Sequence, residues 1–269
     1  MNSMGKRIGI IIAVIVVIFI LIVGIILGTK VAPYLALKNM VELLQNEDYT
    51  FQLNYSVTGA ELPFGDYLMD GTIEGEKVDE TLHGNFLIEN QNALEIYANA
   101  GSECLFNITP VFERMLDAVD KVSPLPLGGL QGGLKDTYVS LEQIQRITMA
   151  EDETETTNQK SMVTELTEAG SYSMKIVERP ENADAEYLDD AKFYQLDFKK
   201  KDVSIILGIP KDESHIYLQI SSVNAEMVGY LSYQVEDLEA ISMPETNVSD
   251  TTIEILHKVY QMWMSIQNK

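Results

Sequence analysis

The chain has 269 residues, a formal net charge of −22 at pH 7 and a single cysteine. Its acidic balance argues against nucleic acid as a partner, because phosphate groups and an acidic surface repel each other. One cysteine cannot form an intramolecular disulfide, so the core must hold the fold. This favours a bacterial cell-surface protein over the disulfide-rich secreted modules of eukaryotes.

The N-terminal segment predicts a membrane anchor. Residues 8–28 carry no charge and no side-chain hydrogen-bonding group, and as a helix they measure roughly 31 Å, the thickness of a bilayer core. Lys6 and Arg7 precede this segment and only Lys30 follows it closely, so residues 1–7 are expected in the cytoplasm. We therefore predict a single-pass protein of the cell membrane, with a linker at 29–33 and an extracytoplasmic domain at 34–269.

Two other interpretations of this segment are open. A cleaved signal peptide would also follow a positive N-terminus, but its apolar region is shorter and ends in small residues, whereas this one ends in Leu27, Gly28 and Thr29. A buried helix of a soluble protein would retain a polar face, which this segment lacks. An uncleaved signal-anchor, with the lipid bilayer as its partner, fits best.

The first half of the domain is predicted to be a helix followed by an antiparallel meander. Pro33 opens a segment with helical apolar spacing that ends near Asp48. Alternation of apolar and polar residues, the period of a half-buried strand, then predicts strands near residues 51–57, 67–73, 82–88, 94–98 and 104–107. Thr109 and Pro110 are expected to be the N-cap and the first residue of a helix that ends near Val122.

Residues 123–136 are rich in proline and glycine but also apolar, which predicts a flexible flap that carries Leu125, Leu127, Leu130 and Leu134. Ser140 is then positioned to cap a short helix together with Gln143. A second meander is expected near residues 172–178, 192–199, 203–209, 215–220 and 226–235, and Ser249 or Asp250 is expected to cap a final helix. The predicted fold class is α+β: a large curved antiparallel sheet, a half-barrel, packed on a few helices. Two separate small domains are the alternative.

This order of elements resembles the LolA/LppX-like family of half-barrels, the periplasmic lipoprotein carriers and their cell-surface relatives. The resemblance lies in a helix that leads into an alternating strand, ALKNMVELLQNEDYTFQLNYSV, and in successive strands with glycines where they bend, GTIEGEKVDETLHGNFLIEN. It covers residues 34–266 and is one of topology, not of a sequence motif.

The resemblance implies an apolar concave face that binds an acyl chain or another hydrophobic ligand, with no catalytic residues. Its lining here would be Phe51, Leu53, Tyr55, Met69, Leu82, Phe86, Ile205 and Leu207, and the flap would be its gate. Alternatively, these side chains only contact the helices and leave no cavity. A membrane anchor would prevent release, so a tethered binder is expected instead of a shuttle.

The sequence contains no pattern typical of a catalytic, metal or cofactor site. His83, His215 and His257 lie far apart without zinc-ligand spacing, and His83 is expected to be solvated. Cys104 lies in a predicted strand and is expected to be a buried structural residue. The carboxylates at 151–155 and at 189–190 do not follow the order of a calcium loop and are expected on the surface.

We therefore expect a non-enzymatic, membrane-tethered binding domain for a hydrophobic ligand or a protein partner of the cell envelope. The alternative is a structural or interaction module of an envelope complex with no ligand cavity, and a hydrolase that uses unrecognised carboxylates ranks third. A ligand cavity would favour the first function, and a filled sheet face the second.

Overall fold

The computed structural model describes residues 35–59, 70–99, 103–121, 135–148, 172–198, 203–211, 215–222, 225–246 and 248–267. The predicted anchor at 8–28, the predicted flap leucines and Met69 lie outside these residues and stay predictions. Within the ranges just given, no helix is both long and apolar enough to cross a bilayer.

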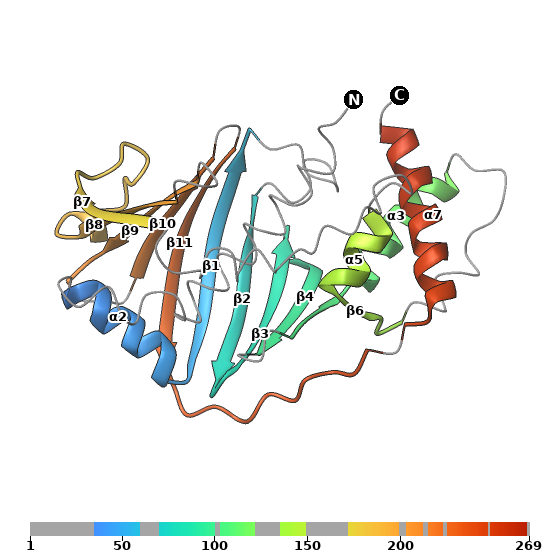
Figure 1. Cartoon of the computed structure of the whole chain (residues 1–269), viewed down its shortest axis with the longest axis horizontal. Coiled ribbons are helices and arrows are strands. Elements are labelled where there is room, and N and C mark those ends of the chain that lie inside the picture. Colours follow the sequence, from blue (N-terminus) through green and yellow to red (C-terminus); the bar gives the residue numbers. More distant parts are fainter. Residues whose placement is uncertain are drawn as a thin grey trace. The chain divides into compact units, whose positions relative to one another are not determined.

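The chain divides into two compact units, each made of two stretches of sequence. One comprises Met1–Glu80 and Thr156–Glu239, and the other comprises Thr81–Glu155 and Ala240–Lys269. We call them the seven-stranded unit and the four-stranded unit, after their described strands, and consider each by itself (Figure 1).

The seven-stranded unit is an antiparallel sheet with the strand order β2-β1-β11-β10-β9-β8-β7. Its strands are β1 (Tyr49–Thr58), β2 (Asp70–Val78), β7 (Tyr172–Val177), β8 (Lys192–Phe198), β9 (Val203–Ile209), β10 (His215–Ser221) and β11 (Glu226–Val235). Helix α2 (Leu35–Asn46) precedes β1, and the short 3-10 helix η3 (Glu186–Leu188) lies between β7 and β8. The expected strands at 51–57, 172–178, 192–199, 203–209, 215–220 and 226–235 are confirmed to within about two residues.

The register places one set of alternate side chains on a common apolar face. Leu53 pairs with Leu231 on β11 and with Ile73 on β2, so all three point to the same side. Following the pairing from strand to strand, this face also carries Phe51, Tyr55, Met227, Ile216, Leu218, Ile220, Ile205, Leu207, Tyr194 and Leu196. We call it the apolar face, and the opposite side of the same sheet the outer face.

Lys77 fixes the end of α2 to this sheet. It pairs with Tyr49 on the apolar face, is 3% exposed, and donates a hydrogen bond of 2.8 Å from Nζ to the carbonyl oxygen of Glu47, just after the helix. The ammonium group also lies 5.7 Å from the centre of the Tyr49 ring. A cation at a helix C-terminus satisfies a carbonyl that has no partner within the helix and complements the helix dipole.

Replacing this cation should weaken the attachment of α2. We expect Lys77→Met to lower the free energy of unfolding by about 2 kcal/mol, because the hydrogen bond from a charged group is lost and the carbonyl stays buried. Urea unfolding followed by far-UV circular dichroism measures the change. The control is Lys175→Met: this lysine is exposed, 3.5 Å from Asp197, and should cost less than about 1 kcal/mol. Equal losses in both variants would contradict the prediction.

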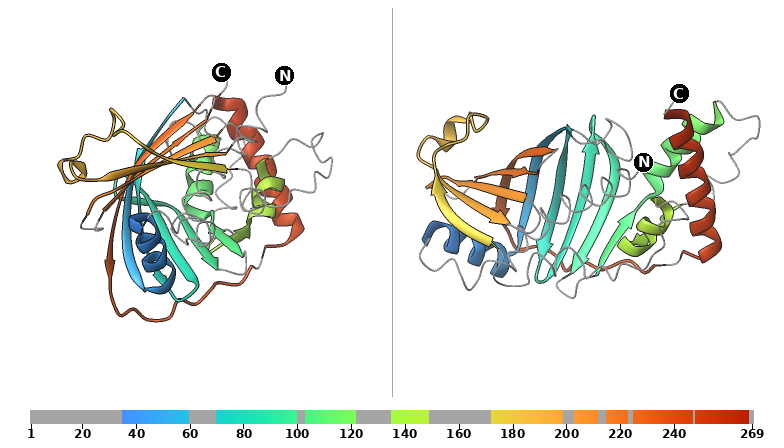
Figure 2. Two further views of the ribbon diagram at one scale, coloured as in Figure 1. Left: turned by 60° about the vertical axis from the view of Figure 1, so that its left-hand side comes forward. Right: turned by 45° about the horizontal axis from the view of Figure 1, so that its top comes forward.

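The four-stranded unit is an antiparallel sheet with the order β6-β5-β4-β3, and its described residues also form three helices. Its elements are β3 (Thr81–Ile88), β4 (Gln91–Asn99), β5 (Cys104–Asn107), α3 (Thr109–Asp120), β6 (Tyr138–Ser140), α5 (Leu141–Thr148) and α7 (Asp250–Gln267). Helix α7 packs against both α3 and α5 (Figure 2). The expected strands at 82–88, 94–98 and 104–107 and the final helix are confirmed.

Polar side chains cap these helices largely as the sequence predicts. The Ser140 hydroxyl accepts from the Gln143 amide and the Gln143 side chain accepts from the Ser140 amide, a reciprocal capping box. Ser249 accepts from the Thr252 amide at the start of α7. The end of α3 at Asp120 lies within two residues of the predicted end. The prediction that Thr109 is the N-cap of α3 is wrong, because the N-cap is Ile108 and Thr109 is the first helical residue.

The reason is a competing contact of Thr109. Its hydroxyl accepts from the Thr137 amide at 3.1 Å, and the Asn107 side chain accepts from the Thr109 amide at 3.1 Å. The side chain of Asn107 therefore satisfies an amide at the start of the helix, while Thr109 holds the segment that leads into β6.

The two-residue turn between β3 and β4 contains Glu89 and Asn90, both with positive φ, at 51° and 61°. This conformation suits asparagine and glycine and is unfavourable for glutamate. We expect Glu89→Asn to raise the free energy of unfolding by about 0.5 kcal/mol, measured by urea unfolding. Glu80→Asn, at an exposed turn position without positive φ, should give no gain, and a gain in both variants would refute the explanation.

Candidate functional site

The structure brings five of the predicted ligand-face residues onto the apolar face of the seven-stranded unit: Phe51, Leu53, Tyr55, Ile205 and Leu207. They come from β1 and β9, which are separated in the sheet by β11 and β10. Leu82 and Phe86 lie in the four-stranded unit, where both point to the same side of β3. Alternation along β1 and β9 therefore assigns these five side chains to one face, since a shift by one residue would turn every side chain over. Their role as the lining of a ligand site stays a prediction.

These side chains are closely covered by the rest of the chain. Leu53 is 1% exposed, Ile205 and Leu207 are 2% exposed and Phe51 is 4% exposed, whereas Tyr55 is half-buried. Side chains that line an open cavity would remain accessible to a water-sized probe. In this conformation the face resembles a packed core at its centre, and Tyr55 marks a less covered position.

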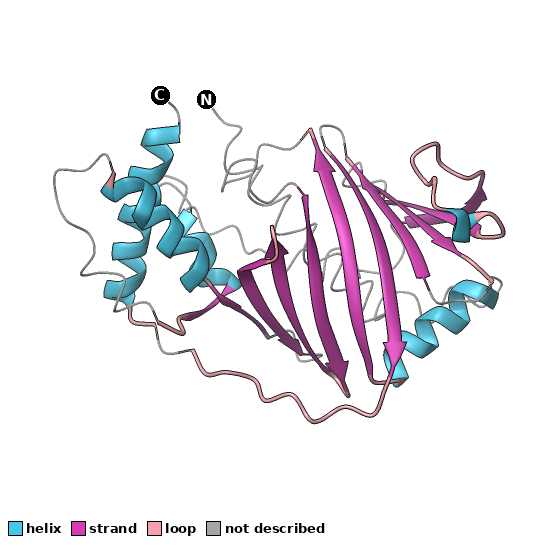
Figure 3. Ribbon diagram, turned by 180° about the vertical axis from the view of Figure 1, so that it is seen from behind, coloured by secondary structure: helices cyan, strands magenta, loops and turns pink. Residues whose placement is uncertain are grey.

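The outer face of the same sheet carries a second apolar layer. Ala183 and Leu188, from the loop at 178–191 that contains η3, pack on Phe193 of β8 and Tyr217 of β10. Figure 3 shows η3 as the short helix between the strands β7 and β8. Ile206 of β9 also packs against this layer. β9 is thus covered on both sides of the sheet, which explains why its sequence is almost continuously apolar.

Polar contacts hold this loop in place. The Arg179 guanidinium group donates to the carbonyl oxygens of Ala183 and Ala185 and to the Asp189 carboxylate, the last at 2.7 Å. Tyr230 donates from its hydroxyl to the carbonyl oxygen of Asn182 at 2.8 Å. We call residues 178–191 the β7–β8 loop; its own side chains and carbonyl groups fix its shape.

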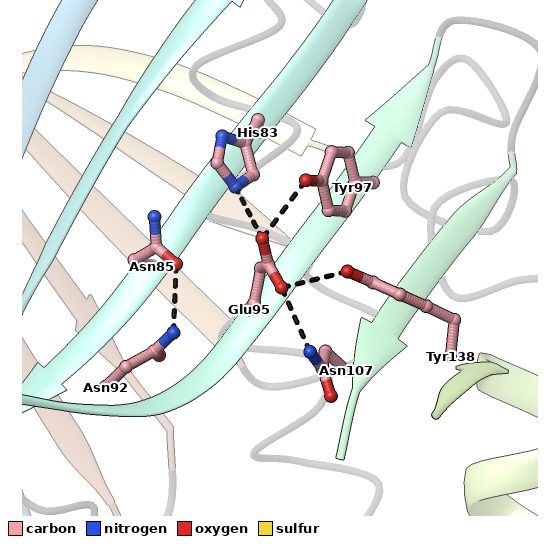
Figure 4. A network of polar contacts seen from close by, with 7 residues as sticks. All are labelled: His83, Asn85, Asn92, Glu95, Tyr97, Asn107 and Tyr138. Atoms are coloured by element: carbon pink, nitrogen blue, oxygen red, sulfur yellow. Dashed lines mark hydrogen bonds and ion pairs between the residues drawn. The ribbon is translucent and has the colours of Figure 1, made fainter. Parts of the chain in front are cut away.

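A polar cluster, which the sequence did not reveal, lies on one side of the four-stranded sheet (Figure 4). At its centre, Glu95 Oε1 accepts from His83 Nε2 and from the Tyr97 hydroxyl, both at 3.0 Å. Its Oε2 accepts from Asn107 Nδ2 at 3.1 Å and from the Tyr138 hydroxyl at 3.2 Å. We call these five residues the Glu95 cluster; one carboxylate in it connects β3, β4, β5 and β6.

The contacts of Glu95 also determine its chemistry. Burial alone would raise its pKa, but hydrogen bonds from Asn107, His83 and Tyr97 and the nearby His83 together lower it. A carboxylate offers about four acceptor positions, and all four are used here. Glu95 is therefore poorly suited to act as a general acid or as a metal ligand in this conformation. Within the described part of the chain, no group of three or more potential ligand side chains is placed to hold a metal ion.

The other residues considered from the sequence have structural contacts. The expectation that His83 is solvated is wrong, because its ring stacks on Tyr97 with centroids 4.4 Å apart. His215 stacks on Tyr187 at 4.6 Å, and His257 donates from Nδ1 to the carbonyl oxygen of Ile147 at 2.8 Å.

Cys104 lies in β5 as expected, but its side chain is half-buried, whereas a buried residue was predicted. Burial raises the pKa of the Cys104 thiol to about 12, as expected for a structural cysteine. Asp189 and Asp190 are exposed and pair with Arg179 and Lys211, whereas the carboxylates at 151–155 lie outside the described residues.

Comparison of the sequence with protein-family models and with curated proteins gives no match. Among solved structures, the fold is similar to that of the lipoprotein LppX from Mycobacterium tuberculosis, with 8% sequence identity and a TM-score of 0.33. The match covers 78% of this chain and 99% of that chain.

Proposed function

We propose that the chain is a non-enzymatic domain, tethered to the membrane by residues 8–28, that binds a hydrophobic ligand or a protein partner on the extracytoplasmic side. The observation that carries the binding proposal is the apolar face, on which Phe51, Leu53, Tyr55, Ile205 and Leu207 lie together. The apolar segment at 8–28 and the charges before it support the tether.

Tyr55 is half-buried, so a ligand would first reach the apolar face at this residue. Its neighbours at the centre of the face are 1–4% exposed, so a ligand must displace covering side chains to go deeper. Burial and the nearby Asp70 carboxylate raise the pKa of the Tyr55 phenol, which therefore stays neutral and can contact an apolar chain.

The same burial favours a second candidate, a structural or interaction module whose sheet face is permanently filled. Side chains such as Leu53 and Ile205 would then contribute only to stability, and partners would bind to exposed surface elsewhere. The two candidates differ in whether any apolar molecule can come into contact with Tyr55.

Two neighbouring tryptophan variants separate the candidates. Tyr55→Trp places an indole on the apolar face, whereas Ser56→Trp places one on the outer face of the same strand. Residues 34–269 are purified without detergent, checked for folding by far-UV circular dichroism and titrated with a brominated fatty acid, which quenches tryptophan on contact. The unsubstituted protein supplies the background signal of Trp263.

Saturable quenching of Tyr55→Trp but not of Ser56→Trp would support ligand binding at the apolar face. Native mass spectrometry of the unsubstituted protein should then reveal a co-purifying lipid at fixed stoichiometry. Equal quenching of both variants, or no quenching together with a bare mass, would reject the ligand and leave the interaction module.

The tether has a separate test. Alkaline phosphatase fused after Lys269 should be active in bacteria, since this enzyme folds only outside the cytoplasm, and the fusion should remain in the membrane fraction after alkaline carbonate extraction. A soluble or inactive fusion would overturn the predicted location without affecting the ligand experiment.

A further inference from the structure

The Glu95 cluster holds the smallest strand of its unit in place. β6 has three residues and pairs with β5 through Leu105–Ser140, Phe106–Val139 and Asn107–Tyr138. Three backbone pairs on a single neighbouring strand give little stability to an edge. The Tyr138 hydroxyl adds a contact to the Glu95 carboxylate, two strands away in the sheet.

The titratable side chains that hydrogen-bond to the Glu95 carboxylate in the described residues come from three strands. His83 faces it from β3, Tyr97 from its own strand and Tyr138 from β6, while Asp136 lies near enough to act on Tyr138. The rings of Tyr97 and Tyr138 also touch edge to face, with centroids 5.9 Å apart. Neutralising Glu95 would leave four donors to share a group that no longer accepts four hydrogen bonds.

We propose that Glu95 is an acid-sensitive clamp: its protonation frees the Tyr138 side chain and releases β6, with the helix that follows it, from the four-stranded sheet. α5 begins directly after β6 and is joined to α7 by the contact of His257 with Ile147 and by the ion pair of Arg146 with Asp250. Release of β6 therefore disturbs the packing of α7.

The sign of the pH dependence follows from the lowered pKa of Glu95. A carboxyl group whose pKa is lower in the folded state than in the unfolded state stabilises the folded state at pH values above its unfolded-state pKa. This stabilisation is lost as the pH falls through the folded-state pKa. The clamp is thus closed at neutral pH and opens below the ordinary glutamate pKa of 4.5.

The single tryptophan of the chain provides the measurement. Trp263 lies in α7, is 7% exposed and packs against Tyr260. We would follow its fluorescence during urea unfolding of the full chain in lipid nanodiscs, at pH 7 and at pH 3.5, for the unsubstituted protein and for Glu95→Gln. Glu113→Gln, an exposed carboxylate on α3 of the same unit, is the matched control.

In the unsubstituted protein, the urea concentration at the unfolding midpoint should fall by on the order of 1 M between pH 7 and pH 3.5. Glu113→Gln should show the same fall. Glu95→Gln should have a lower urea midpoint at pH 7, and this midpoint should fall less on acidification. Tyr138→Phe keeps the carboxylate but removes its contact to β6, so it should also start lower, which tests the clamp if Glu95→Gln does not fold.

Amide hydrogen exchange at pH 7 shows where the clamp acts. In Glu95→Gln, residues 138–148 should exchange faster, while the centre of α3 keeps its protection. An equal loss of midpoint on acidification in the unsubstituted protein and Glu95→Gln, or faster exchange throughout the unit without preference for 138–148, would overturn the proposal.

Discussion

Gly208→Ala should destabilise the protein by about 3 kcal/mol, because the added methyl group would overlap the ring of Phe193. Gly208 on β9 pairs with Phe193 on β8 and with Tyr217 on β10. A Cβ atom at this position would lie 2.5 Å from Cε1 of Phe193 and 3.0 Å from Cβ of Tyr217. The Phe193 ring is 4% exposed beneath the β7–β8 loop, so it cannot move aside without disturbing that loop.

Gly229→Ala is the matched control in the same sheet. Its Cβ would lie 2.9 Å from Cδ1 of Leu53, which is the end of a flexible side chain on the apolar face. A small rotation of that side chain can relieve the contact, so the cost should be about 1 kcal/mol. Urea unfolding followed by far-UV circular dichroism compares the two variants. If Gly208→Ala costs no more than Gly229→Ala, the close packing of Phe193 over Gly208 is not a source of stability.

The sequence predicts the strands well because most of them have one apolar and one polar side. β11 alternates in this way and begins and ends at the predicted residues, and Leu53 and Leu207 lie on the same face. The antiparallel α+β class is therefore confirmed for the described residues.

The outer layer could not be predicted, because its partners lie far apart in sequence. Tyr217 alternates with apolar neighbours in the run HIYLQIS, and nothing local shows that Ala183 and Leu188 cover it. A glycine in a run such as VSIILGI usually indicates only a weak strand position, yet Gly208 leaves the space that the ring of Phe193 occupies. Long-range packing, not local pattern, determines this second layer.

The Glu95 cluster was missed for a related reason. His83, Glu95 and Asn107 lie on the polar side of their strands, where a solvated side chain is the ordinary expectation. The available signal was that the polar positions of adjacent strands also carry Tyr97 and Tyr138, whose hydroxyl groups seek an acceptor when partly buried. Only the strand pairing shows that all of them converge on one carboxylate.

Tyr217→Ala should have the largest effect of the substitutions considered, about 4 kcal/mol, because it empties the centre of the outer layer. Tyr217 is 0% exposed and meets Phe193 and Tyr230 edge to face, with centroids 6.0 and 5.6 Å apart. Its hydroxyl lies 2.6 Å from Asn182 Oδ1 and 2.9 Å from Gln219 Oε1. Both the ring and the hydroxyl therefore join the sheet to the β7–β8 loop.

Tyr217→Phe separates these two contributions, since it keeps the ring and removes only the hydroxyl. It should cost about 1 kcal/mol in urea unfolding, the usual value of one hydrogen bond. Amide exchange in residues 178–191 should be faster in Tyr217→Ala than in Tyr217→Phe, because only the alanine variant removes the surface on which Leu188 and Ala183 pack. Equal losses in the two variants would mean that the hydroxyl contact to Asn182, and not the aromatic packing, holds the loop on the sheet.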